Sequence, residues 1–270
     1  MENIRDGVRG TGSQRNAEER KRGADGRFRE VDLARGVAII MVVVYHFVFD
    51  LDNFVGLDIE STSGFWGAFA DVSAFAFVFL AGVSLEISYA RARRERGTDG
   101  LFGKYLLRGL KVIGWGMLIT LVFVLLDFGY VLFGILHLIG LSIILAYPFL
   151  RRRLLSLVFG GLFIAAGLYV SSLEIVLGGV PGVLLSPLGV LPEGLFMPDY
   201  RPLLPWFGVA LLGLAFGNYV YAGRTETGGN PASAGYAGPL AFLGRHTLFI
   251  YLIHQPIIIA GLWALGLISF

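Results

Sequence analysis

The chain has 270 residues, of which 55% are hydrophobic and 16% are charged, and its mean hydropathy is +0.69. A soluble domain typically carries about 25% charged residues, so this composition excludes a soluble globular protein and indicates an integral membrane protein. The formal net charge is +2, and the sequence contains no cysteine, which excludes disulfides and thiolate metal sites. Membrane lipids are the expected surroundings, and no nucleic-acid partner is expected.

Residues 1–30 differ sharply from the rest of the chain, because they are mixed in charge and almost free of apolar side chains. Such a segment cannot bury enough apolar surface to fold, so we expect a disordered cytoplasmic tail. It has no apolar core resembling that of a signal peptide, and the first membrane helix should therefore be uncleaved. Residues 31–270 should form a single membrane domain.

Seven apolar windows follow, and each approaches the length of about 20 residues that a helix needs to cross a bilayer. The windows are 33–51, 65–89, 105–126, 131–149, 154–173, 203–222 and 240–267. The predicted fold is therefore all-α, a polytopic membrane helical bundle of about seven transmembrane helices. The fourth and sixth windows are near the lower length limit. Pro256 predicts a kink in the long last helix or a first turn at the interface.

The distribution of lysine and arginine predicts the orientation of this bundle. Of 22 basic residues, only Arg201 falls in a predicted outer loop. Cytoplasmic loops carry an excess of such residues, so the amino terminus should be inside and the carboxyl terminus outside. The outer loop 174–202 is apolar, and we expect it to cap the bundle at the membrane surface.

The sequence shows no internal repeat, which argues against the commonest transporter designs, since these are built from repeated halves. Residues Gly213 and Gly217 form a GxxxG match in the sixth window. In so glycine-rich a chain, this match favours packing inside the bundle over a dimer face, and a homo-oligomer is left open.

Arg35 and His46 lie on one face of the first predicted membrane helix. Eleven residues make three helical turns plus about 20°, and the two positions are about 16 Å apart along the axis. A cation and an imidazole in a bilayer cost several kcal/mol unless they face protein or water, so such residues are functional by default. The alternative is a snorkelling arginine near the helix end together with a hydrogen-bonded structural histidine.

Helix direction sorts the remaining polar residues into two layers. The outer layer comprises His46, Asp50, Asp71, His137, Asp199, Arg201 and His254. The inner layer is basic and comprises Arg35, Arg108, Lys111 and Arg245. Arg108 and Lys111 are one helical turn apart, which suits phosphate oxygens. The alternative reading of the inner cations is that they only set the membrane topology, and we favour it for the Arg151 turn and most of the Arg91–Arg96 cluster.

A reaction that uses both layers needs an anionic donor at the cytoplasmic face and chemistry near the opposite face. Coenzyme A meets this requirement if the inner cations Arg35, Arg108, Lys111 and Arg245 hold its phosphates. His46 is then the general base or acyl-transfer residue, with Asp71 and His137 as its companions. The candidate acceptor contacts are Asp50, Asp199, Arg201 and His254. No metal is expected, because no HxxxH or HExxH pattern occurs.

Five motifs run in order through the chain after residue 29. They read EVDLARGVAIIMVVVYH (30–46), ADVSAFAFVFLAG (70–82), FGILHLIG (133–140), DYRPLLPW (199–206) and GRHTLFIYLIHQP (244–256). Together they resemble the prokaryotic heparan-α-glucosaminide N-acetyltransferase-like membrane proteins. The Arg-x10-His spacing also resembles the first helix of the broader transmembrane acyltransferases that modify surface sugars. The resemblance implies a multi-pass acyltransferase of the cell membrane, with acetyl-CoA as cytoplasmic donor substrate and a sugar or glycan acceptor at the other face.

The chain departs from the family pattern at one point. The animal members place the catalytic histidine in the loop after the first of these helices, and the corresponding loop here, Asn53 to Gly64, has none. His46 is therefore assigned from its own position, and an acetyl-histidine intermediate is not implied. The resemblance covers the membrane core and no acceptor-binding domain, so the acceptor and the acyl chain are left open.

Two other classes of function compete with an acyltransferase. A small transporter or flippase for an anionic solute would use the same cations without covalent chemistry. A non-catalytic membrane scaffold is disfavoured by the number of ionisable groups inside the predicted spans.

Overall fold

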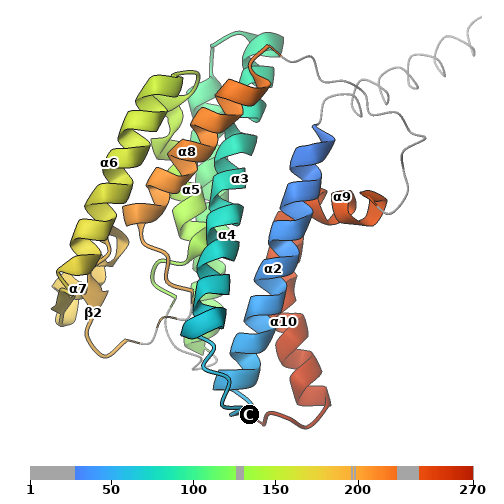
Figure 1. Cartoon of the computed structure of the whole chain (residues 1–270), viewed down its shortest axis with the longest axis vertical. Helices are drawn as coiled ribbons and strands as arrows, with labels where there is room; N and C mark the ends of the chain where they lie inside the picture. Colours follow the sequence, from blue (N-terminus) through green and yellow to red (C-terminus); the bar gives the residue numbers. More distant parts are fainter. Residues whose placement is uncertain (1–27, 126–130, 196, 198, 224–236, 270) are drawn as a thin grey trace, which may run out of the picture.

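The structure is a computed structural model that describes residues 28–125, 131–195, 197, 199–223 and 237–269. The described residues form an all-α bundle (Figure 1). Among them, six helices are long and apolar enough to cross a membrane. These are α2 (Arg29–Asn53), α3 (Gly64–Arg96), α4 (Leu101–Leu125), α6 (Arg153–Ser172), α8 (Leu203–Tyr221) and α10 (Thr247–Ala264). The predicted polytopic helical fold is confirmed, while the predicted tail falls almost wholly outside the described ranges.

The fourth predicted span is shorter than expected. Window 131–149 forms α5 (Ile135–Leu145), a helix of 11 residues, followed by the 3-10 helix η1 (Tyr147–Phe149). Pro148 explains the early end, because it lacks the amide hydrogen that would bond to the carbonyl of Ile144 and its ring would clash there. Helix α5 is therefore too short to cross a bilayer by itself.

The last predicted span is broken, but not at its proline. Window 240–267 divides at His246 into α9 (Ala237–Arg245) and α10, and Pro256 lies inside α10. In Figure 1, α9 lies across the first part of α2, whereas α10 runs down alongside α2. The break therefore comes from contacts of the α9–α10 corner, which are described with the site below.

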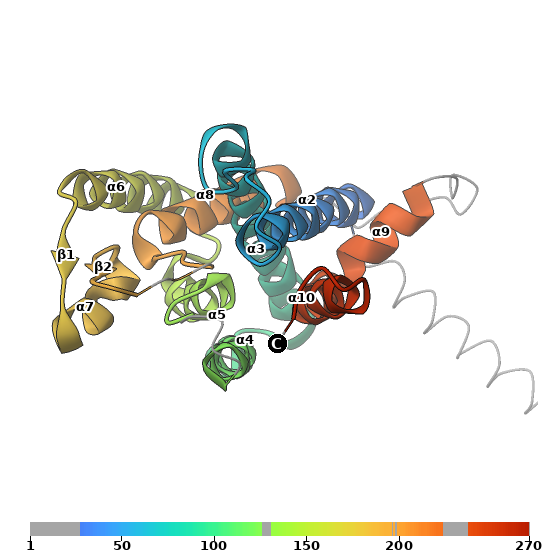
Figure 2. The same ribbon diagram turned by 90° about the horizontal axis from the view of Figure 1, so that it is seen from below.

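Small residues bring α3 and α8 together at the centre of the bundle. The backbone of Gly82 lies against the carbonyl of Ala210, and that of Gly213 lies against the carbonyl of Phe79, so that neither position has room for a Cβ atom. Gly217 packs on α3 one turn further along. The GxxxG match thus packs inside the bundle, as predicted. On its other side α8 packs against α6 (Figure 2).

The predicted outer loop folds into a small unit beside α6 and α5. It contains β1 (Val176–Leu177), α7 (Gly179–Leu185), the 3-10 helix η2 (Ser186–Leu188) and β2 (Leu191–Pro192), and the two strands pair in parallel. Figure 2 shows this unit at the edge of the bundle, away from α2 and α10. The predicted cap thus covers the bundle beside α6, and it does not extend over α2 and α10.

The end of this loop returns to the bundle and fixes the start of α5. Tyr200 pairs with Gly134 in an isolated antiparallel bridge, and its hydroxyl donates to the carbonyl of Ser186 at 2.6 Å. Burial raises the pKa of Tyr200 to about 12, so the phenol remains a hydrogen-bond donor at neutral pH. These contacts place Asp199 next to the helices of the bundle.

Candidate functional site

A cavity of about 310 Å³ lies at the end of the bundle where α2 begins. Its wall combines the first turns of α2, the last turns of α3 and the first turns of α4. Among the described residues, its wall contains four cations and two carboxylates, namely Arg35, Arg91, Lys104, Arg108, Asp32 and Glu95. The excess of positive charge makes this basic cavity a candidate site for an anionic ligand.

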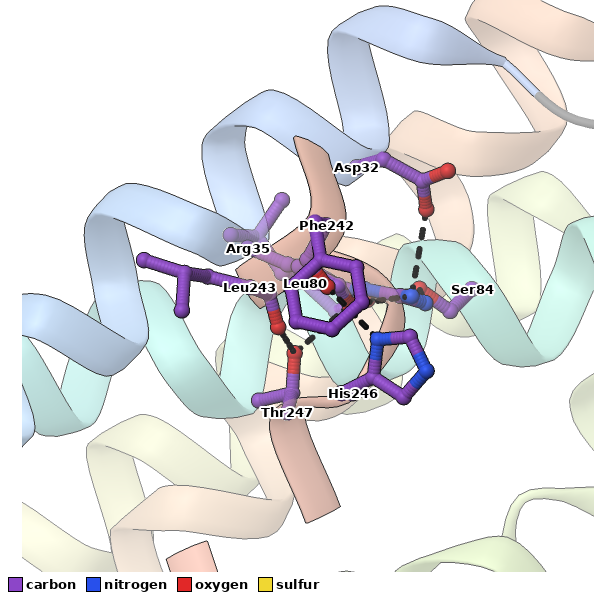
Figure 3. Close-up of polar contacts among 9 residues, drawn as sticks. Asp32, Arg35, Leu80, Ser84, Phe242, Leu243, His246 and Thr247 are labelled. Carbon is purple, nitrogen blue, oxygen red and sulfur yellow. Dashed lines mark hydrogen bonds and ion pairs between the residues drawn. The ribbon is translucent and has the colours of Figure 1, made fainter. Parts of the chain in front are cut away.

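Arg35 connects the basic cavity to the corner between α9 and α10 (Figure 3). Its Nε and Nη2 atoms donate to the carbonyl of Gly244 at 3.0 and 2.6 Å. Nη1 donates to the hydroxyl of Ser84 at 3.3 Å, and Nη2 forms an ion pair with Asp32 at 3.1 Å. The hydroxyl of Thr247 donates to the same Gly244 carbonyl at 2.7 Å. The guanidinium therefore joins α2, α3 and α9. Arg35 thus has a structural role in addition to the predicted contact with the phosphates of coenzyme A.

Two glycines allow α9 to cross α2 at backbone contact distance. The α carbon of Gly244 faces the carbonyl of Asp32, and that of Gly36 faces the carbonyl of Leu240, so that a Cβ atom would collide at either position. Both glycines belong to the motifs identified in the sequence, beside Arg35 and Arg245. The close crossing holds the Gly244 carbonyl within reach of Arg35.

We expect Arg35→Ala to lower the stability of the protein even without a ligand. The buried Gly244 carbonyl would lose its charged partner and keep only the Thr247 hydroxyl, and a hydrogen bond to a charged group contributes about 1.5–3 kcal/mol. Thermal unfolding in detergent should therefore show a lower midpoint for this variant. Arg245→Ala is the matched control, because Arg245 is exposed on the same corner and lies outside the cavity wall. Equal midpoints for the two variants would contradict the structural role of Arg35.

The structure divides the predicted donor-binding residues into two groups. Arg35 and Arg108 line the basic cavity, and Arg108 also donates to the hydroxyl of Ser88 at 3.3 Å. Lys111 and Arg245 are exposed and lie outside its wall. The sequence prediction had not selected Lys104, which the structure adds to the wall together with Arg91.

A second cavity, of about 410 Å³, lies between α2, α4 and α10 toward the opposite end of the bundle. Most of its wall is apolar, and five polar side chains contribute to it: His46, Asp199, Tyr251, His254 and Gln255. We call it the histidine cavity. Three residues predicted for the outer layer meet there, and Tyr251 and Gln255 are additions from the structure.

His46 and His254 form the polar centre of the histidine cavity. Their rings meet edge to face, with centroids 4.8 Å apart. Nδ1 of His46 lies 2.8 Å from the carbonyl of Val42, and Nδ1 of His254 lies 2.6 Å from that of Tyr251. A carbonyl can only accept, so Nδ1 carries the proton in each ring and Nε2 of the neutral ring has a free lone pair. Each histidine can therefore accept a proton at Nε2.

Asp199 is the carboxylate that lies beside these histidines. It accepts hydrogen bonds from the Tyr251 hydroxyl at 2.8 Å and from the Ile135 amide at 3.1 Å. Burial raises the pKa of Asp199, while these two hydrogen bonds and the charges of Arg201 and His254 act in the opposite direction. Asp199 holds the Tyr251 side chain and the start of α5 in place at the cavity wall.

Asp71 does not join His46, contrary to the predicted grouping. Its side chain is 68% exposed and pairs with Arg201 at 3.4 Å. The Arg201 guanidinium also lies over the ring of Trp206, 5.1 Å from its centroid. Asp71 and Arg201 thus form a surface pair outside the wall of the histidine cavity. The position of Asp71 along its helix suggested the grouping, but the position does not determine the direction of its side chain.

His137 also lies outside that wall, and its hydrogen bonding differs from that of His46 and His254. The Gly134 amide donates to its Nδ1 at 3.3 Å, which caps the start of α5. Nδ1 is therefore the acceptor and Nε2 carries the proton, so the remaining nitrogen of His137 is a donor and not a base. Its ring packs against Gly116 of α4. The predicted partnership of His137 with His46 is not observed.

Asp50 lies behind the cavity wall. It is fully buried, and both of its carboxylate oxygens accept from Nε2 of Gln255 at 2.8 and 2.9 Å. This contact ties α2 to α10 and fixes the Gln255 amide, with its oxygen turned away from Asp50. Asp50 itself does not line the histidine cavity, whereas Gln255, which it holds, does.

The two cavities are separate in this structure, although a reaction that uses both layers of polar residues needs a path between them. Their walls share no residue among the described part of the chain. Ile39 and Val42 lie between Arg35 and His46 on the same face of α2 and are 1% and 4% exposed. These two side chains fill the path along α2 from one cavity to the other.

The fold and the two cavities define a class of protein. It is an integral membrane helical bundle with one basic cavity and one cavity lined by histidines. The family model of the heparan-alpha-glucosaminide N-acetyltransferase catalytic domain matches residues 27–256, and the chain belongs to this family. Membership implies acyltransferase activity. The comparison with curated proteins finds no match, and neither does the comparison with solved structures. Within the described residues, no cluster of three or more potential metal ligands occurs.

Proposed function

We propose that this protein transfers an acetyl group from cytoplasmic acetyl-CoA to a sugar or glycan acceptor at the opposite face of the cell membrane. The observation that supports this most directly is the basic cavity at the beginning of the helix that also bears His46. The excess of basic residues at that end places it on the cytoplasmic side in this proposal.

The basic cavity fits the donor by charge. Arg91, Lys104 and Arg108 would hold the phosphates of coenzyme A, with Arg35 fixed behind them. Coenzyme A supplies the acetyl group as an activated thioester. The arm that carries the thioester has to pass Ile39 and Val42 to reach His46, so transfer requires these packed side chains to separate.

The histidine cavity would supply the base. The Nε2 atom of His46 or His254 takes a proton from the acceptor amine or hydroxyl as the nitrogen or oxygen attacks the thioester carbonyl carbon. A carbon–nitrogen or carbon–oxygen bond forms, the carbon–sulfur bond breaks, and the coenzyme A thiolate takes up a proton as it leaves. The Asp199–Tyr251 pair lies at the wall where this proton transfer takes place.

Arg108→Ala and Lys111→Ala make a matched test of donor binding. Both residues are exposed cations one turn apart on α4, but only Arg108 lines the basic cavity. Losing one charged contact at the cavity mouth should weaken coenzyme A binding by about 1–2 kcal/mol, or about 5- to 30-fold in Kd. Lys111→Ala should leave the Kd nearly unchanged. Equilibrium binding of labelled coenzyme A to purified protein measures both values.

The same samples distinguish an enzyme from a transporter. Saturable flux of an intact anionic solute into liposomes, without coenzyme A binding at millimolar concentration, would contradict the acyltransferase. Equal losses of binding in the two α4 variants would contradict the assignment of the donor to the basic cavity.

A further inference from the structure

We propose that the acceptor is amphipathic, a sugar headgroup carried on a hydrocarbon chain, and that it enters the histidine cavity from the membrane between α4 and α10. The inference rests on the proposed function and specifies its acceptor. Three observations support it: the apolar wall, two buried unpaired acceptor atoms, and the position of the cavity between two separately packed helices.

The wall of the histidine cavity is apolar along its length and polar at one end. Helix α4 contributes Trp115, Leu118, Ile119, Val122 and Phe123. Among the described residues, no lysine or arginine belongs to this wall, in contrast to the wall of the basic cavity. A hydrophilic glycan strand would lose hydration along α4 without gaining hydrogen bonds, whereas a hydrocarbon chain would bury apolar surface there, which is favourable.

At the polar end of the histidine cavity, two buried hydrogen-bond acceptors have no donor among the described residues. Nε2 of His254 and Oε1 of Gln255 are buried, and neither has a partner among the described residues. Both atoms are acceptors, because Nδ1 of His254 and Nε2 of Gln255 are the donating atoms in their bonds to Tyr251 and Asp50. A buried acceptor without a partner destabilises the empty cavity, because it has lost its hydrogen bonds to water. A ligand with O–H or N–H groups, such as a sugar hydroxyl or amine, would satisfy both atoms.

The cavity lies on the side of the bundle where two helices are held independently. Helix α4 packs on α5, and α10 packs on α2. Figure 2 shows α4 and α10 on the same side of the molecule. Trp115, Leu118 and Val122 of the wall keep 45%, 47% and 41% of their surface exposed. In a bilayer such apolar exposure faces lipid chains, so the hydrocarbon chain of an acceptor can remain in the membrane while its headgroup reaches the histidines.

Fluorescence quenching tests this inference without depending on turnover. The protein in liposomes is titrated with a dodecyl glucosaminide brominated on its chain, and separately with a brominated dodecane that lacks the sugar. We expect saturable quenching of Trp115, absent in Trp115→Phe. The apparent affinity should be about 5- to 150-fold higher for the glycoside, which is the equivalent of the about 1–3 kcal/mol gained when one buried acceptor is satisfied.

Val122→Phe should reduce this quenching, because it fills the cavity, and Leu121→Phe is the matched control, since Leu121 is 53% exposed and lies outside the wall. Equal quenching by the glycoside and by the plain chain would mean that the cavity holds an ordinary lipid, and it would overturn the inference. Absence of saturable quenching would overturn it as well. Coenzyme A binding is measured on the same preparations, so the failure of the acceptor inference can be distinguished from the failure of the acyltransferase itself.

Discussion

His46→Ala should lower the rate of acetyl transfer by about 10²- to 10⁴-fold, the usual contribution of a positioned general base. The Nδ1 proton of His46 is fixed by the Val42 carbonyl, which leaves Nε2 free to accept a proton in the histidine cavity. The basic cavity is about 16 Å away along α2, so the Kd for coenzyme A should change by less than about twofold. Single-turnover acetylation and equilibrium coenzyme A binding measure these two quantities separately.

His246→Ala is the control for this variant. His246 is exposed, it lies at the α9–α10 corner, and its Nδ1 bonds to the Phe242 carbonyl at 2.9 Å. Its loss should leave the rate of acetyl transfer nearly unchanged. If His46→Ala lowered the unfolding temperature, the coenzyme A affinity and the rate together, His46 would be a packing residue and its role as a base would be refuted.

The sequence was sufficient to predict the fold class, because a membrane-spanning helix is recognised from the mean hydropathy of about 20 consecutive residues. Twenty apolar residues form a helix in a bilayer whatever their neighbours are, and the six long helices follow from that rule. The details that failed depend on contacts distant in sequence. Beside the break at His246, Arg35 binds the Gly244 carbonyl, and these two groups are 209 positions apart. Hydropathy contains no information about that contact.

The candidate site was predictable where one helix determines it. Arg35 and His46 share a face of α2 by helix geometry alone, and each lines a cavity in the structure. The filled path between them was also visible in the sequence, since Ile39 and Val42 follow Arg35 by four and seven residues on the same face. A path from Arg35 to His46 along α2 would therefore have to displace those two buried side chains.

Residues on different helices could not be grouped, because depth in the membrane does not fix the rotation of a helix. Asp71 and Asp199 were both assigned to the outer layer, yet only Asp199 faces the histidine cavity. Lys104 could have been found, since it precedes Arg108 by four residues and therefore lies on the same face of α4. It was overlooked because it lies just before the apolar window.

His254→Ala should lower the rate of acetyl transfer by about 10²-fold, and the double variant with His46→Ala should be no more than about threefold slower than the slower single variant. The two rings are in edge contact at 4.8 Å, and each has Nε2 as its free nitrogen. When one ring accepts the acceptor's proton, the lone pair of the other lies next to the new charge. Residues that act as such a unit show strongly non-additive effects.

Leu252→Ala separates this coupling from a simple change in cavity shape. Leu252 lies on the same helix and in the same wall, but it cannot bind a proton. Its truncation should alter acceptor affinity more than the rate at saturation, and it should combine with His46→Ala multiplicatively, since the two residues would then act on different steps. The measurement is a double-mutant cycle on single-turnover rates. If the rate losses of His46→Ala and His254→Ala multiplied as well, the two rings would act independently. The histidine pair would then not be one proton-accepting unit, and only His46 would keep its assignment as the base.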